Sequence, residues 1–150
     1  SMVSSDGEVG RFMATPQNQA EIGDGYDLLA GEATIDLEHF EFVPGEPAEL
    51  DIDIAFGQLT VVVPRDAYVE MDGSMQAGQI VFFDTQRNGQ GVTFVDNDGD
   101  ADSEARVSLH VEGAVGQIEV ERSPRRALFE PERPRPEPSP TRTRATRERP

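Results

Sequence analysis

The residues whose types and spacing could do chemistry are the aspartates of an acidic run near position 100. Every second residue of the run is an aspartate: Asp96, Asp98, Asp100 and Asp102. Carboxylate oxygens are the ligands that Ca²⁺ prefers, so the run is a candidate calcium loop. It does not follow the EF-hand pattern, because the sixth and twelfth positions hold Ala101 and Val107 where that pattern requires glycine and glutamate. The alternative interpretation is a solvated acidic loop between two strands.

Other candidate catalytic groups lack a second constraint. His39 and His110 are the only histidines, and each alternates with apolar neighbours, which predicts a position on the polar face of a strand. Ser108 lies close to His110, but nothing places a base against its hydroxyl, so no triad is indicated. Asp51 and Asp53 share one face and could mimic a glycosidase pair, yet a chain with 29 acidic residues produces such pairs by chance. The sequence therefore predicts neither an enzyme nor a cofactor site.

The elements that would position these residues are short strands with strict alternation of apolar and polar residues. In residues 50–64, Leu50, Ile52, Ile54 and Phe56 share one predicted inward face, and Leu59, Val61 and Val63 share another. The alternation slips by one residue at Gly57. Such a change of phase at a glycine is typical of a bulge or corner, where the backbone turns.

The same pattern recurs along the chain. The corners are predicted at Gly31, Gly57, Gly78 and Gly116, and residues 91–95 could form a further rung. At the last corner, Val107, Leu109, Val111 and Val115 form the predicted inward face. Repeats of this kind indicate a stacked architecture in which no single rung can bury its apolar face alone. We therefore expect an all-β, single-domain, solenoid-like stack of short strands with glycine corners; a bent β-sandwich is the alternative.

The domain organisation follows from composition. Ser1-Met2 resembles a cloning scar, and we expect residues 1–10 to be a scar and flexible segment, 11–122 the β-domain and 123–150 a disordered Pro/Arg-rich tail. Residues 3–25 are predicted to be a loop. Residues 84–91 are predicted to be a polar loop with a tight turn at Asn88-Gly89.

Charge is divided unevenly along the chain. Residues 1–121 contain 25 Asp or Glu and four Arg, a net charge of −21, whereas residues 122–150 contain nine Arg and four Glu, a net charge of +5. An acidic β-domain repels phosphate, so nucleic acid is not an expected partner. The Arg-rich tail could contact anionic lipid or an acidic partner.

The order of these motifs resembles a known family. Three segments are similar to the C-terminal "toastrack" β-domain of actinobacterial PspC-domain (phage-shock-protein-C-like) membrane proteins and of LiaF-type stress regulators. They are Gly31-Glu32-Ala33-Thr34-Ile35-Asp36-Leu37, Gly57-Gln58-Leu59-Thr60-Val61-Val62-Val63-Pro64 and Gly116-Gln117-Ile118-Glu119-Val120. The resemblance covers residues 11–121.

This resemblance implies a non-catalytic interaction and regulatory domain of an envelope-stress-response protein anchored in the cell membrane. Its implied partners are other membrane or signalling proteins, with a histidine kinase among them. Two other functions remain open on the residues alone. One is a secreted calcium-binding adhesive β-domain, and the other is a self-assembling, bactofilin-like β-helical scaffold.

Overall fold

The computed structural model describes residues 8–124, which form a single β-domain with one short helix. The elements in chain order are β1 (Glu8–Ala14), α1 (Gln19–Ile22), β2 (Tyr26–Asp36), β3 (Ala48–Val63), β4 (Tyr68–Phe82), β5 (Thr85–Asp98) and β6 (Arg106–Arg122). The expected all-β, toastrack-type fold class is confirmed. Within the described part of the chain, no helix is long and apolar enough to cross a membrane.

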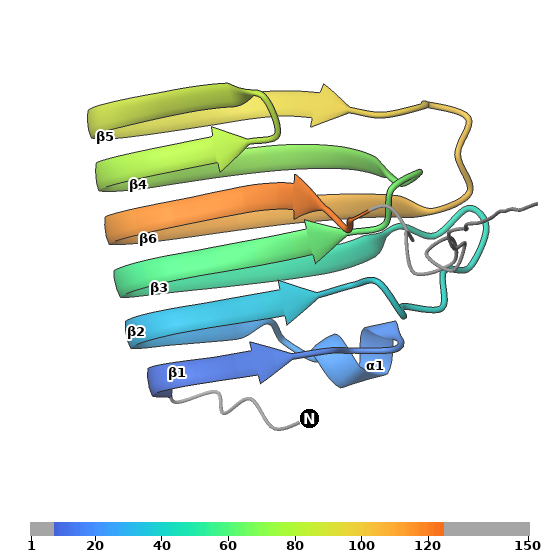
Figure 1. Cartoon of the computed structure of the whole chain (residues 1–150), viewed down its shortest axis with the longest axis horizontal. Coiled ribbons are helices and arrows are strands. Elements are labelled where there is room, and N and C mark those ends of the chain that lie inside the picture. The colour runs from blue at the N-terminus through green and yellow to red at the C-terminus, as the bar shows by residue number, and fades with distance from the viewer. Residues whose placement is uncertain (1–7, 125–150) are drawn as a thin grey trace, which may run out of the picture.

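The six strands form one sheet whose order differs from their order in the sequence. The order is β1-β2-β3-β6-β4-β5, so β6, the last strand, is inserted between β3 and β4. All neighbouring pairs are parallel except β4 and β5, which form an antiparallel hairpin. Figure 1 shows the strands stacked from β1 at the bottom to β5 at the top. The strands therefore do not pile up as consecutive coils.

Each long strand is continuous and bends back on itself, at the left of Figure 1, so that the sheet folds into two layers. In β3, the buried side chains before the bend are Leu50, Ile52 and Ile54, and those after it are Leu59, Val61 and Val63. The buried set changes phase at the bend, as the sequence pattern predicts, because both layers must point their apolar side chains into the space between them. In β2, β3, β4 and β6 a glycine lies at the bend. We call the part of the strand before this glycine the N-arm and the part after it the C-arm.

A column of glycines crosses all six strands at the bends. In sheet order its members, each paired in register with the next, are Gly10, Gly31, Gly57, Gly116, Gly78 and Gly89. All six have positive φ, from 105° to 147°. The four predicted corner glycines belong to this column, and the fifth rung turns at Gly89 and not at Gly91.

Glycine is required here for two reasons. A positive φ is strained for residues with a Cβ. In addition, a Cβ on Gly116 would overlap the carbonyl oxygen of Gly57, and a Cβ on Gly57 would overlap that of Gly31. The absence of a side chain thus lets the backbones of neighbouring rungs approach one another at the bend.

Two predicted loops are wrong. Residues 3–25 contain β1 and α1, whose first turn is capped by the Asn18 side chain accepting a hydrogen bond from the Glu21 N–H (3.0 Å). Residues 85–91 lie within β5, and the turn that precedes them is formed by Phe83 and Asp84. The alternation in residues 85–91 is too weak to predict a strand because this half of β5 is an exposed edge.

The ends of the domain are closed by specific contacts. The Gln19 side-chain amide both donates to the Glu49 carbonyl and accepts from the Glu49 N–H (3.0 Å each), so it replaces a strand partner where β3 extends beyond β2. Ser123 is buried, and its N–H donates to the Val63 carbonyl (2.8 Å), so the ordered domain extends past the predicted boundary at 122. The predicted disorder of the rest of the tail concerns residues 125–150, which lie outside the described residues, as do 1–7.

We expect Gly116→Ala to destabilise the domain more than Gly89→Ala does. Both substitutions introduce strain of about 1–3 kcal/mol at positive φ, but only the first also forces a Cβ onto a neighbouring backbone, since nothing lies within 4 Å of a Cβ at Gly89. Urea titration of the two variants measures the difference. Equal losses of unfolding free energy would show that close approach of the rungs is not the constraint.

Candidate functional site

The aspartates of the acidic run do not converge. The Asp98 carboxylate is paired with Arg122 (2.8 Å), the Asp96 carboxylate accepts from the Asn97 N–H (2.8 Å), and that of Asp100 accepts from the Asp102 N–H (2.9 Å). Within residues 8–124, no three His, Cys, Asp or Glu side chains lie close enough together to hold a metal ion. The run therefore forms the end of β5 and the turn after it, and its carboxylates do not converge as calcium ligands would.

The two histidines lie on different parts of the domain, one on a strand and one in a turn. His110 is on the outward face of β6, with its ring nitrogens 3.9 Å from an Asp72 carboxylate oxygen and 3.4 Å from a Glu112 carboxylate oxygen. The prediction that both histidines lie on strands holds for His110 only. His39 is exposed in the turn that follows β2, because that strand ends at Asp36.

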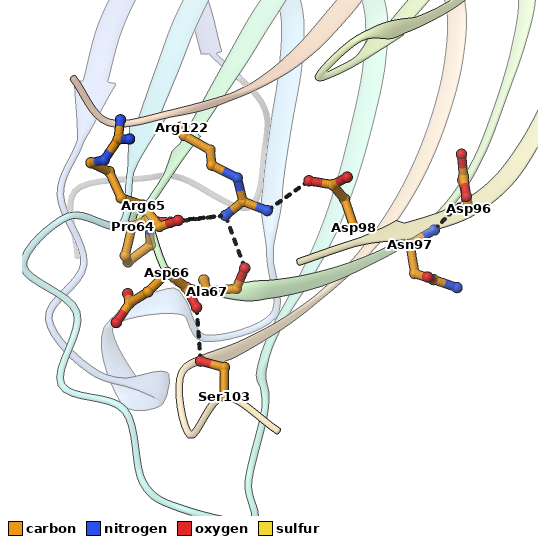
Figure 2. A network of polar contacts seen from close by, with 9 residues as sticks. All are labelled: Pro64, Arg65, Asp66, Ala67, Asp96, Asn97, Asp98, Ser103 and Arg122. Atoms are coloured by element: carbon orange, nitrogen blue, oxygen red, sulfur yellow. Dashed lines mark hydrogen bonds and ion pairs between the residues drawn. The ribbon is translucent and has the colours of Figure 1, made fainter. Parts of the chain in front are cut away.

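Arg122, at the end of β6, makes the densest polar network in the described structure (Figure 2). Its guanidinium donates to the carbonyl oxygens of Pro64 (3.1 Å), Arg65 (3.2 Å) and Ala67 (2.9 Å), which belong to the connection between β3 and β4. It also pairs with Asp98 and lies 4.5 Å from the centre of the Phe83 ring. The arginine thus fastens the inserted strand to the chain that crosses over it, which is a structural task.

A hollow of about 590 Å³ opens beside this network, at the end of the domain opposite the bends. Arg65, Asp66, Asp100 and Glu104 line it, and the Ser103 hydroxyl donates to the Asp66 carbonyl (2.8 Å). Its polar lining contains no His or Cys, and its serine hydroxyl is already engaged with backbone carbonyls. The hollow therefore lacks a nucleophile with an adjacent base.

The bends carry an exposed strip of apolar side chains. Register places Ala30, Phe56, Val115 and Ala77 side by side on β2, β3, β6 and β4, directly before the glycine column. Phe56 is 59% exposed and Val115 42%. Their predicted inward position is wrong, because the phase change begins one residue before the glycine and turns these side chains outward.

A second apolar row lies next to this one. Leu29, which is 47% exposed, Ala55 and Ala114 each precede the first row by one residue in β2, β3 and β6. We call the two rows together the apolar ridge: Leu29, Ala30, Ala55, Phe56, Ala77, Ala114 and Val115.

A column of carboxylates borders the ridge on the outward face of the N-arms. Asp27, Asp53 and Glu112 are register partners on β2, β3 and β6. Partial burial, with the negative charges of Asp27 and Glu112, raises the pKa of Asp53 above its ordinary value. His110 lies beside this column, with its Nε2 3.4 Å from a Glu112 carboxylate oxygen. We call these three residues the acidic column.

Comparison with known proteins identifies the domain. The family described as "Cell wall-active antibiotics response LiaF, C-terminal" matches residues 25–120, which include β2 to β6 almost completely. The chain belongs to this family. The description of this family links the LiaF-like domain to the response to cell-wall-active antibiotics. No curated protein matches the chain in sequence.

One solved structure is similar to the LiaF-like domain in fold. It is a crystal structure of a "putative cell adhesion protein" from Clostridium sporogenes ATCC 15579, with a TM-score of 0.54 and 16% sequence identity. The match covers 77% of this chain and 52% of the other, so the chain spans about half the length of that protein. At this identity the likeness shows the shared fold alone.

Sequence reasoning missed the apolar ridge of the LiaF-like domain. Alternation assigns Phe56 and Val115 to the core because they keep the phase of the preceding strand residues. The one available signal was the alanine that precedes each of them, Ala55 and Ala114, since this makes two consecutive apolar residues before each glycine.

We expect Arg122→Ala to lower the unfolding free energy by about 2–3 kcal/mol, because three carbonyl oxygens and the Asp98 carboxylate lose a charged donor. Arg122→Lys should recover only a part, since an ammonium cannot reproduce the planar fork. Arg87→Ala is the matched control, because Arg87 is exposed and its contact is with the Phe94 ring, 5.6 Å from the centroid. A loss in urea titrations as small as that of the control would contradict the fastening role.

We expect Asp53→Asn to stabilise the domain at neutral pH. A raised pKa in the folded state means that the ionised carboxylate opposes folding at neutral pH and that the opposition fades as pH falls through that pKa. The gain in melting temperature over the unsubstituted protein should therefore be present near pH 7 and shrink towards pH 4. Glu70→Gln is the control, since its register partners Ser108 and Asn97 are uncharged. A gain that does not change with pH would contradict the electrostatic explanation.

Proposed function

We propose that this LiaF-like domain is a non-catalytic protein-interaction module that regulates the envelope stress response. The observation that carries the proposal is the distribution of its side chains. The carboxylates and histidines of residues 8–124 form no cluster that could hold a metal ion, whereas the exposed side chains of Leu29, Phe56 and Val115 lie together at the bends. An exposed apolar strip with a polar border is typical of a protein–protein contact surface.

The proposal extends to the whole protein. On the likeness of the motifs at Gly31, Gly57 and Gly116, the domain belongs to an actinobacterial PspC-type protein anchored in the cell membrane. Its proposed partners are other membrane or signalling proteins, and a histidine kinase is one candidate among them. The arginines that follow Pro124 supply a second, electrostatic contact with anionic lipid or an acidic partner.

The two alternative functions gain less support. An adhesive calcium-binding domain needs converging oxygen ligands, and the aspartates of residues 96–102 are engaged separately. A bactofilin-like scaffold would be a β-helix of consecutive coils, whereas here β6 is inserted between β3 and β4 and β5 runs antiparallel. The interaction module is the function that the arrangement of the described residues supports best.

Crosslinking in living cells tests this function. The full-length protein with the intact domain is treated with a carbodiimide, which joins carboxylates of the domain to lysines of a neighbouring protein, because the domain has no lysine of its own. During exposure to a cell-wall-active antibiotic it should yield adducts with membrane or signalling proteins. The control is the same protein with Gly116→Val, in which the stack cannot close, and its adducts should be lost. Recovery of soluble metabolic enzymes alone, or the same adducts from the control, would refute the proposal.

A further inference from the structure

The apolar ridge is too regular to be scattered surface apolarity. Leu29, Phe56 and Val115 come from three neighbouring strands, and each is more than two fifths exposed. Because neighbouring strands lie about 4.8 Å apart, these side chains form a continuous strip across the stack. Isolated exposed apolar residues need no explanation, but a contiguous strip is a cost in solubility unless something covers it.

The ridge and the acidic column form one surface with two chemistries. Asp53 and Ala55 are successive outward residues of the β3 N-arm, and the same spacing relates Asp27 to Leu29 and Glu112 to Ala114. The carboxylates therefore run parallel to the ridge along its N-arm side. On the other side, the next register position past the glycines holds Gln58, Gln117 and Gln79, which are uncharged, and Glu32, which pairs with Arg11 (3.3 Å). The one carboxylate at that register position thus has an arginine partner, unlike the carboxylates of the acidic column.

Like charges on adjacent strands oppose each other across the acidic column. The ion pairs formed by residues 8–124 include no arginine at Asp27, Asp53 or Glu112. Partial burial raises the pKa of Asp53 most, and the charges of Asp27 and Glu112 raise it further, so a part of this shift comes from the repulsion along the column. A cationic group placed along this column would relieve it.

We propose that the ridge and the acidic column are the docking surface for a basic amphipathic helix of a partner protein. The helix runs along the stack and lays its apolar stripe on Leu29, Phe56 and Val115. Lysines or arginines on one flank then face Asp27, Asp53 and Glu112. The inference rests on the proposed function and adds the place of contact and the chemistry of the partner.

A helix fits the spacing of this surface. Side chains at i, i+3 and i+4 of a helix lie about 5–6 Å apart, close to the 4.8 Å between neighbouring strands. The ridge crosses β2, β3, β6 and β4, a span of about 14 Å, which corresponds to roughly ten helical residues at 1.5 Å each. Such pairing of a helix with an apolar surface is a recurring mode of peptide recognition.

Two other occupants are disfavoured by distance and charge. The chain's own Leu128-Phe129 is the only apolar pair of residues 125–150, yet Leu128 is four residues after Pro124 and reaches at most about 14 Å from it. Val115 lies seven strand residues, or about 23 Å, before the end of β6. An anionic bilayer would be repelled by the acidic column.

The experiment uses two synthetic helical peptides labelled with a fluorophore. Both have the same leucine stripe, and one has lysines along a single flank where the other has glutamates. The whole chain is titrated into each peptide, and binding is followed by fluorescence anisotropy. The lysine peptide should bind at least about tenfold more tightly than the glutamate peptide, and added salt should reduce this difference.

Variants of the surface locate the contact. Phe56→Ser should weaken binding of the lysine peptide at least about tenfold, and Leu29→Ser is a second variant of the same strip. The double substitution Asp53→Asn with Glu112→Gln should remove the preference for lysine over glutamate. Val43→Ser is the control, because Val43 is 52% exposed but lies between β2 and β3, at the end of the domain away from the bends. Circular dichroism confirms that each variant remains folded.

The outcomes separate this inference from the proposed function. Equal affinity for both peptides, no binding, or binding unaffected by Phe56→Ser would overturn the helix-docking proposal. So would a dimer in light scattering that Phe56→Ser converts to a monomer, since the ridge would then be covered by a second copy. If cellular crosslinking still captures signalling proteins in the presence of Phe56→Ser, the regulatory function stands and the ridge is not its contact surface.

Discussion

Close approach of backbones at the bends is the constraint on which the rest of the structure depends. Six glycines with positive φ, one in each strand, stand in register from Gly10 to Gly89. At Gly57 and Gly116 a side chain would overlap the carbonyl of the next rung. Because the strands can turn sharply at this column, each long strand folds back on itself, and two layers of short strand segments enclose one apolar core. Without the bend the apolar side chains on either side of the glycine would face opposite sides of a flat sheet.

The insertion of β6 between β3 and β4 makes the domain dependent on its last strand. β6 pairs with β3 on one side and β4 on the other, so the central ladder cannot form until residues 106–122 are in place. Arg122 then joins the end of this strand to the connection that crosses over it and to Asp98 at the end of β5. Contacts between residues so distant in sequence carry a high entropic cost of closure. The arginine stabilises the arrangement at the point where this closure is completed.

The same bend that builds the core also creates the surface that distinguishes this domain. At the outside of a sharp turn the side chains splay outward, so Phe56 and Val115 are exposed although they continue an apolar series. The carboxylates beside them come from the alternation of the N-arms, which places every second residue on the outer face. Stacking brings both features into register across β2, β3 and β6, and this turns separate sequence positions into one amphipathic surface.

The amino-acid sequence alone determined the all-β class, the change of phase at Gly31, Gly57, Gly78 and Gly116, and the likeness to the LiaF family, because these depend on local alternation and motif order. Tertiary structure decided which strands are neighbours. The alternation of apolar and polar residues shows which face of a strand is buried, but it does not show which other strand pairs with each edge. The tertiary structure also decided which contacts the acidic run makes, because Asp98 pairs with Arg122 only when β6 lies between β3 and β4. The apolar ridge was likewise decided by the tertiary structure. The backbone geometry of the bend determines whether Phe56 points inward or outward, and the polarity of that residue alone does not predict it.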